Sequence, residues 1–255
     1  MKTHLPHPLE IHDLTVGYNQ KPVLYGIDVE MEEGSLVGII GPNGAGKSTL
    51  IKTVMGMMKP EDGYVKIFGE TGKKAITRVG YVPQRESVDW DFPVTAMDVV
   101  LMGRFGHTRW YQRVSKRDRL FASECLEQMS MLPYADRQIG NLSGGQQQRV
   151  FLARALAQQS DLYLMDEPFE GVDAVTEKAI VELLKNLRDQ KKTLLIVHHD
   201  LSTAKEYFDQ LLLLNLRMVA YGQASDVFTN ELLQRTYGGK LTVLSEVGSR
   251  NIGKN

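Results

Sequence analysis

The feature that most constrains the fold is a glycine-rich loop between an apolar run and a helix-like segment. The run Leu36–Ile40 leads into the spacing G-x-x-x-x-G-K-S, which begins at Gly41, and residues 50–58 then have a helical pattern. Glycines let the backbone curl so that several N–H groups point at phosphate oxygens, and the next helix adds the positive end of its dipole. The stretch therefore predicts a strand, a phosphate-binding loop and a helix, and with them an α/β fold.

Individual side chains of this loop have predictable tasks. Lys47 can reach the β- and γ-phosphates of a nucleotide, and the hydroxyl of Ser48 can bind Mg²⁺. A glycine-rich turn that binds nothing is the alternative, and the flanking strand and helix disfavour it. The predicted nucleotide-binding residues of the loop are Gly41, Pro42, Asn43, Gly44, Ala45, Gly46, Lys47, Ser48 and Thr49.

The rest of the chain reads as a nucleotide-binding core interrupted by helices. Alternation and turn residues predict strands over 9–16, 28–31, 64–68, 78–82, 162–165 and 193–197, with a closing hairpin over 211–215 and 218–221. Thr95, Ser115 and Ser143 are candidate caps for helices over 96–102, 116–131 and 144–159, and a further helix is predicted over 175–188. Strands that alternate with helices indicate a parallel sheet. We predict one domain, with a core over 1–84 and 160–255 and a helical subdomain over 85–159.

Composition excludes several classes of protein. Lysine and arginine number 30 against 31 acidic residues, so the net charge of -1 gives no reason to expect nucleic acid as a partner. A single cysteine, Cys125, excludes an internal disulfide framework and fits a reducing cytosol. No apolar stretch approaches the ~20 residues of a membrane span. We expect a cytoplasmic protein whose membrane contact, if any, goes through a partner or the surface.

Two carboxylates follow the apolar run over 162–165. Ligands of open α/β sheets bind at the carboxyl ends of strands, which places Asp166 to hold Mg²⁺ and Glu167 to deprotonate an attacking water. Many strands end in acidic residues without any catalytic role. The phosphate loop in the same chain favours the catalytic interpretation.

A second strand end and a second glycine turn are further candidates. Residues 193–197 run into His198 and His199, and a histidine here could donate to a γ-phosphate; the alternative, a polar strand terminus, fits His198 better. The turn at 143–146 resembles another anion cradle without a lysine, although a capped helix start is the commoner explanation. One nucleotide does not need two cradles within one chain, but a second chain could use the second one. The residues of this turn are Ser143, Gly144, Gly145 and Gln146.

These motifs together closely resemble the nucleotide-binding subunits of ATP-binding cassette (ABC) transporters. Residues 41–48 match the Walker A motif, 142–146 (LSGGQ) the signature motif and 162–167 the Walker B motif, all in the family order. The resemblance implies a P-loop NTPase (RecA-like) core with an antiparallel β subdomain and a helical subdomain. It also implies roles for single residues: Gln84 as Q-loop sensor of the γ-phosphate and Mg²⁺, His199 as switch histidine, Asp173 as D-loop aspartate and Tyr18 as adenine-stacking aromatic.

The same resemblance implies partners. Two chains would form a head-to-tail homodimer in which each ATP lies between one chain's Walker A loop and the other chain's LSGGQ, and hydrolysis would drive membrane permease subunits. Trp90, Phe92, Phe169 and Val172 resemble the branch that serves manganese, zinc or iron importers. That branch implies an extracytoplasmic metal-binding protein as an indirect partner and a place on the cytoplasmic face of the membrane.

Other functions stay open at this point. The same ATPase could serve another substrate, such as a chelated-iron complex. A soluble cassette ATPase acting on DNA or ribosomes usually has two cassettes or a long coiled-coil insertion, and a small-molecule kinase needs no LSGGQ. Trp110 and Tyr111, in an aromatic cluster with His107 and Arg109, either contact the membrane subunits or pack within the helical insert.

Overall fold

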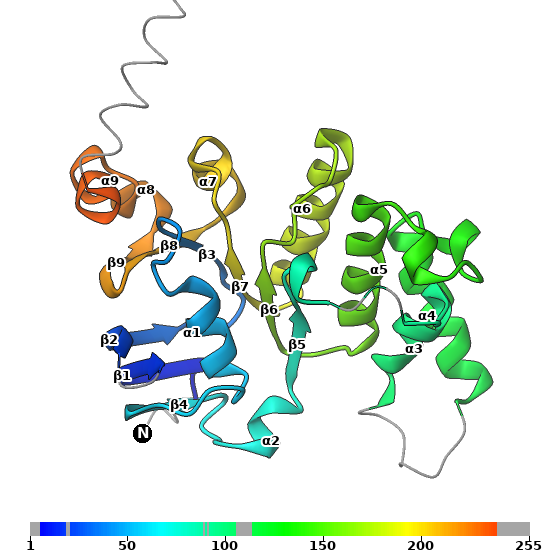
Figure 1. The fold of residues 1–255 in the computed structure, drawn as a ribbon, viewed down its shortest axis with the longest axis horizontal. Helices are drawn as coiled ribbons and strands as arrows, with labels where there is room; N and C mark the ends of the chain where they lie inside the picture. The colour runs from blue at the N-terminus through cyan, green and yellow to red at the C-terminus, as the bar shows by residue number, and fades with distance from the viewer. Residues whose placement is uncertain (1–5, 19–20, 89, 91, 106–113, 239–255) are drawn as a thin grey trace, which may run out of the picture. The chain divides into compact units, whose positions relative to one another are not determined.

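The computed structural model describes residues 6–18, 21–88, 90, 92–105 and 114–238. The chain divides into two compact units, one formed by Met1–Gly69 with Val197–Asn255 and the other by Glu70–Ile196. Figure 1 traces both units by residue number from blue to red. The predicted division into a core and a helical subdomain at 85–159 stays a prediction.

The first unit begins with an antiparallel sheet. Its strands are β1 (Leu9–Tyr18), β2 (Lys21–Met31) and β4 (Asp62–Lys66), in the order β2-β1-β4. Alternate side chains of β1, such as Leu9 and Ile11, are buried, as expected for a strand with one face on the core. Strand β2 begins at Lys21 rather than at 28, because its first half pairs with β1 across a hairpin.

A second group of strands in this unit carries the phosphate loop. Strand β3 (Leu36–Ile40) is buried throughout and pairs in parallel with β8 (Gln210–Asn215), which pairs antiparallel with β9 (Arg217–Gln223) and confirms the predicted hairpin. The helices of the unit are α1 (Lys47–Val54), α7 (Leu201–Tyr207), α8 (Ala224–Val227) and α9 (Asn230–Tyr237). Helix α9 lies against β8 and β9 (Figure 1).

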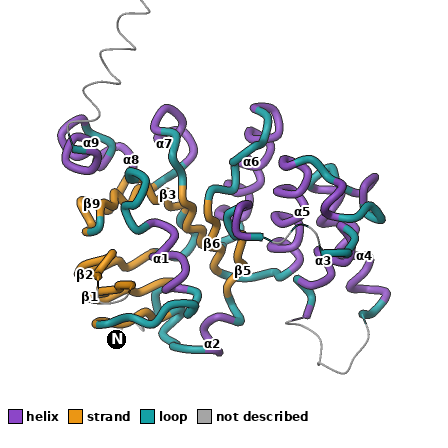
Figure 2. The backbone as a smooth tube through the Cα atoms, in the orientation of Figure 1, coloured by secondary structure: helices purple, strands orange, loops and turns teal. Residues whose placement is uncertain are grey.

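The second unit contains three neighbouring strands and most of the helices. Strands β5 (Val79–Val82), β6 (Leu162–Asp166) and β7 (Thr193–Val197) lie in that order, and β5 and β6 are parallel. Helices α3, α4 and α5 pack on one another, as the purple segments of Figure 2 show. The helices are α2 (Lys73–Ile76), α3 (Ala96–Met102), α4 (Lys116–Gln128), α5 (Gly144–Ala157) and α6 (Ala174–Asp189), with 3-10 turns at Arg85–Ser87, Leu132–Tyr134 and Ile139–Asn141.

The predicted helix caps are confirmed. Thr95, Ser115 and Ser143 each accept a hydrogen bond from the backbone N–H three residues on, in reciprocal capping boxes. Three helices end before the predicted residue. A left-handed residue follows each of them, at Gly56 (φ 68°), Ser130 (φ 55°) and Gln159 (φ 51°), and this conformation stops the helical hydrogen-bond ladder.

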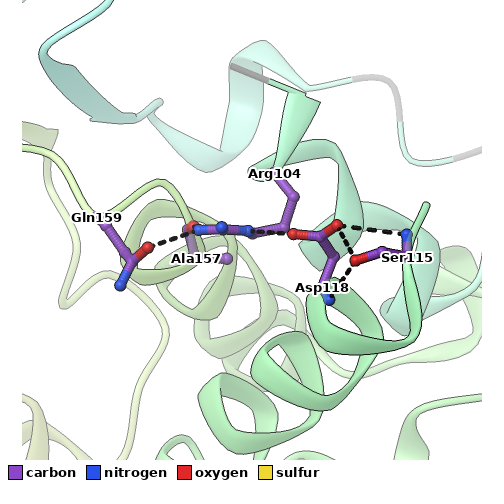
Figure 3. Close-up of polar contacts among 5 residues, drawn as sticks. All are labelled: Arg104, Ser115, Asp118, Ala157 and Gln159. Carbon is purple, nitrogen blue, oxygen red and sulfur yellow. Dashed lines mark hydrogen bonds and ion pairs between the residues drawn. The ribbon is translucent and has the colours of Figure 1, made fainter. Parts of the chain in front are cut away.

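A polar network joins the end of α3 to the start of α4 (Figure 3). Arg104 Nε donates to Asp118 Oδ1 at 3.0 Å, and its Nη1 donates to the carbonyl oxygen of Ala157 and to Gln159 Oε1, both at 2.8 Å. Asp118 Oδ2 also accepts from the Ser115 hydroxyl at 2.6 Å. The segment between these anchors, with His107, Arg109, Trp110 and Tyr111, lies outside the described residues.

Candidate nucleotide-binding site

The phosphate loop curls tightly after β3. Gly44 and Gly46 have φ of 80° and 94°, which a side chain would strain, and Ala45 N–H donates to the Pro42 carbonyl at 3.1 Å. A Cβ on Gly46 would lie 2.5 Å from Leu24 Cδ2, so the loop also needs this glycine for space. Helix α1 begins directly after it without a side-chain cap, which leaves its first N–H groups to an anion.

Lys47 spans the mouth of this curl. Its side chain is buried, with 7% exposed, and Nζ donates to the carbonyl oxygens of Gly41 at 2.7 Å and Pro42 at 3.1 Å. The ammonium group therefore lies over the loop's own backbone. A phosphate group bound in the loop would contact it there. Ser48 and Thr49 follow on the first turn of α1, half-buried and buried.

The strand end at β6 combines a buried acid with a strained one. Asp166 is 1% exposed at the last position of β6. Glu167 has φ of 53°, a left-handed conformation that costs a non-glycine residue of order 1 kcal/mol or more and clusters at functional sites. The turn beyond is held by Glu170 N–H donating to the Glu167 carbonyl at 3.2 Å. This conformation turns the chain sharply at the predicted base.

The signature turn starts helix α5, and Arg85 lies over it. Ser143 Oγ and Gln146 Oε1 form the capping box, which leaves the N–H groups of Gly144 and Gly145 outside the helix ladder. A Cβ on Gly144 would lie 2.8 Å from the Arg85 guanidinium carbon. The signature turn has no lysine of its own, but the guanidinium of Arg85, in the segment after β5, lies beside it.

The signature turn also touches the loop after β6. A Cβ on Gly145 would lie 3.0 Å from the backbone oxygen of Gly171. Two residues on, Asp173 caps α6: its carboxylate accepts from Val175 N–H at 3.1 Å and Thr176 N–H at 3.0 Å, and the Thr176 hydrogen bonds lower the pKa of Asp173. Within the second unit, the signature turn therefore lies against the loop that leads to Asp173.

Gln84 lies at the junction that the sequence predicts. It follows β5 and precedes the 3-10 turn Arg85–Ser87, where its carbonyl accepts from the Ser87 hydroxyl at 2.6 Å. The next residue, Arg85, donates from Nε to Gln147 Oε1 at 3.2 Å and accepts from the Trp90 indole N–H at 3.0 Å. The backbone at Gln84 is thus tied to the signature helix α5.

The two histidines after β7 differ. His198 is 2% exposed, its Nε2 lies 2.8 Å from the Thr203 hydroxyl, and burial lowers its pKa to about 4. Its backbone N–H donates to the Ile39 carbonyl at 3.0 Å, beside the start of the phosphate loop. His199 is exposed, so it is the histidine that could reach a ligand. Tyr18 ends β1, but its side chain lies outside the described residues.

Sequence reasoning missed three residues near the predicted site. Arg85 lies over the signature turn, and only its place beside Gln84 marks it. Leu214 and Leu216, at the end of β8 and just after it, lie behind the phosphate loop: a Cβ on Gly41 would collide with the Leu214 carbonyl, and Leu216 N–H donates to the Ala45 carbonyl at 3.0 Å. Helix α9 itself was not predicted, although Thr229, its N-cap, precedes an amphipathic stretch that carries the ordinary signal of a helix start.

Comparison with known proteins identifies the class that this site belongs to. Residues 24–170 match the ABC transporter family, and the chain belongs to it as an ATP-binding subunit. The chain is 56% identical over 239 residues to the manganese transport system ATP-binding protein MntB of Bacillus subtilis, covering 94% of this chain and 96% of that one. It is likewise 56% identical over 236 residues to the zinc transport system ATP-binding protein TroB of Treponema pallidum, covering 92% and 89%.

Solved structures confirm the predicted ABC-type fold. An inward-facing ABC transporter described as of the metal-chelate type matches with a TM-score of 0.79 and 26% identity, covering 90% of this chain and 88% of that one. A dimeric ATP-binding cassette bound to ADP and Pi matches with a TM-score of 0.74 and 28% identity, covering 85% and 98%. Among the described residues, no helix is both long and apolar enough to cross a membrane.

Proposed function

We propose that this chain is the ATP-hydrolysing subunit of an importer for manganese or zinc. The observation that carries the proposal is the curled loop with buried Lys47 over its backbone carbonyls, in a chain 56% identical to relatives named for manganese and zinc transport. Two copies would bind two ATP head to tail and drive permease subunits that receive the ion from an extracytoplasmic metal-binding protein. The chain would then work on the cytoplasmic face of the membrane, without nucleic acid.

The nucleotide would be held by groups of both copies. The phosphate loop, Gly41 to Thr49, would bind the phosphates through its N–H groups and Lys47, and Tyr18 would stack on the adenine. The partner copy would supply its signature turn, Ser143 to Gln146, and Asp173. In this arrangement the lysine-free signature turn binds the ATP held by the other copy. The dimer is isologous, so it closes without forming fibres.

Hydrolysis would use Glu167 as the base and His199 as a donor to the γ-phosphate. The strained backbone at Glu167 supports a functional role for this residue, because such strain persists only where surrounding structure maintains it. Oxygen donors suit Mg²⁺, and the ligands that we propose for it are the hydroxyl of Ser48, the amide of Gln84 and the carboxylate of Asp166. When bound, Mg²⁺ would neutralise charge on the β- and γ-phosphates.

The test replaces Glu167 by Gln, which keeps size and hydrogen bonding but removes the base. ATP hydrolysis should fall by ~10²–10⁴ while ATP binding persists. The matched control is Glu182→Gln, an acid whose side chain is 70% exposed on α6 and pairs with Lys185. In cells that lack their own importer, uptake of labelled manganese or zinc should need Glu167 and not Glu182. Uptake that is unaffected by Glu167→Gln would contradict the proposal.

A second substrate class has one observation in its favour. The solved transporter with a TM-score of 0.79 is described as of the metal-chelate type. If this chain served a chelate, uptake driven by it would be stimulated by the metal complex and not by the free ion. Measuring uptake of free and chelated metal side by side separates the two substrates.

A further inference from the structure

The signature turn has backbone groups that suit an anion but no cationic side chain of its own. The N–H groups of Gly144 and Gly145 stay outside the helix ladder, at the positive end of the α5 dipole. Residues 143–146 contain neither lysine nor arginine, whereas the phosphate loop has Lys47. A phosphate at the signature turn would therefore meet only partial charges from the turn itself.

The guanidinium of Arg85 lies against this turn. A Cβ on Gly144 would be 2.8 Å from its carbon Cζ and 3.1 Å from both Nε and Nη2. Any side chain at position 144 would therefore displace the guanidinium from where it lies. Gly144 leaves space for a cation as well as offering its own N–H group.

Neutral groups hold Arg85 in this place. Its Nε donates to Gln147 Oε1 at 3.2 Å. Gln147 is itself fixed, since it is only 4% exposed and its Nε2 donates to the Ile139 carbonyl at 3.1 Å. At the backbone end, the Trp90 indole N–H donates to the Arg85 carbonyl at 3.0 Å. These contacts orient the side chain without neutralising its charge.

The charge of Arg85 is available to a ligand. Arg85 is half-buried, and no carboxylate pairs with it among the side chains that the structure describes. A partly desolvated cation without a counterion is unfavourable, so binding of an anion beside it would be correspondingly favoured. A terminal phosphate presents several charged oxygens, which match the planar fork of a guanidinium.

A second arginine near the turn is less suitably placed. Arg149 Nε donates to the carbonyl oxygen of Gly145 at 3.4 Å. Helix carbonyls point toward the C-terminal end, away from a ligand at the first N–H groups. The group that Arg149 contacts is thus on the far side of the turn from a bound phosphate. Arg85, which lies against Gly144, is the better candidate.

We propose that Arg85 is a phosphate-binding residue of the signature turn. Its guanidinium supplies the positive charge with which one copy of the chain binds the terminal phosphate of the ATP held by the other copy. This inference rests on the proposed function, in which the turn already meets that ATP, and it adds the side chain that carries the charge. Arg85 should therefore contribute to the ATP-dependent dimer and not to nucleotide binding by a single chain.

The test compares Arg85→Met and Arg85→Lys in the full-length Glu167→Gln chain, by sedimentation with ATP. Arg85→Met removes a charge-assisted contact at both equivalent sites, so the dissociation constant of the dimer should rise about 10- to 100-fold. Arg85→Lys keeps the charge but loses the bond to Gln147, so the rise should stay below about fivefold. Both variants should bind ADP, which has no terminal phosphate, as tightly as the parent by calorimetry.

The matched control is Arg78→Met, at the other end of β5. The Arg78 side chain is 43% exposed and pairs with Asp161 at 2.7 Å, so this variant also removes one arginine charge from the second unit. Its ATP-dependent dimer should match that of the parent. The melting temperature without nucleotide separates binding from a structural role: Arg85→Met should not lower it, because the variant removes a half-buried charge that lacks a counterion.

The outcomes distinguish this inference from the proposed function. If Arg85→Met dimerises like a parent that does form the dimer, the role of Arg85 is overturned and the head-to-tail arrangement stands. If Arg85→Lys loses as much as Arg85→Met, the bond to Gln147 matters rather than the charge, which also overturns the phosphate-binding role. If the Glu167→Gln parent itself forms no dimer with ATP, the shared site of the proposed function is wrong, and the role of Arg85 is wrong with it.

Discussion

The side-chain nitrogen of Lys47 lies 2.7 Å from the carbonyl oxygen of Gly41, six residues earlier in the chain. A triphosphate would exchange this neutral acceptor for charged oxygens, which form stronger hydrogen bonds with an ammonium group. Lys47→Ala should therefore raise the dissociation constant for ATP about 10- to 100-fold. Lys52→Ala, on the same helix α1, is the control and should bind normally by calorimetry. Normal affinity in folded Lys47→Ala protein would argue against the site.

The signature turn should be needed for the dimer and not for binding to a single chain. Glu167→Gln should trap ATP and give a nucleotide-dependent dimer in sedimentation. Adding Gly144→Asp places a carboxylate in the cradle, where it repels phosphate and pairs with Arg85, whose guanidinium lies beside this position. The double variant should bind ATP as a monomer and form no dimer. A double variant that still dimerises would show that this turn does not face the nucleotide.

Stability should depend on pH through His198. Its pKa is about 4 in the folded chain against 6.5 ordinarily, so the unfolded chain binds a proton that the folded chain does not. The contribution of His198 to the free energy of unfolding should therefore be fully present above pH 6.5. The free energy of unfolding should then fall by up to ~3 kcal/mol as the pH approaches 4. Asp200 and His199 face the His198 ring. The pKa of Asp200 is lowered, so protonation of Asp200 should affect stability only at more acidic pH.

His198→Asn is the variant that isolates this effect. It keeps a polar side chain but removes the titrating group, so the difference from wild type should shrink between pH 7 and pH 4.5. Urea unfolding at both pH values measures it, and effects of the other histidines cancel in the comparison. Equal pH dependence in both proteins would contradict the assignment to His198.

The network in Figure 3 should stabilise the helical part of the second unit. The side chains of Arg104 and Asp118 are 13% and 10% exposed, so each single substitution leaves a largely buried charge without its counterion. Arg104→Met and Asp118→Asn should each lower the free energy of unfolding by roughly 1–3 kcal/mol. The double variant should lose less than the sum of the two. Additive losses in urea unfolding would show that the pair is not energetically coupled.

Local chemistry was predictable where it depends on neighbours in the sequence. The loop from Gly41, the caps Thr95, Ser115 and Ser143, and strands β3 and β7 follow from glycine spacing, capping side chains and apolar runs. Helix ends were predicted less well, because Ser130 and Gln159 adopt left-handed conformations that their residue types do not signal.

The sequence by itself therefore determined the α/β class, the phosphate loop and the membership of the ABC transporter family, because these depend on short-range spacing. Only the tertiary structure placed Arg85 over Gly144, Gly145 against Gly171, and the Leu214 carbonyl behind Gly41. Such contacts join segments far apart in the chain, and no spacing encodes them. Packing determines which side chain fills the space that a glycine leaves. Burial keeps His198 neutral, whereas its neighbour His199 is exposed to solvent.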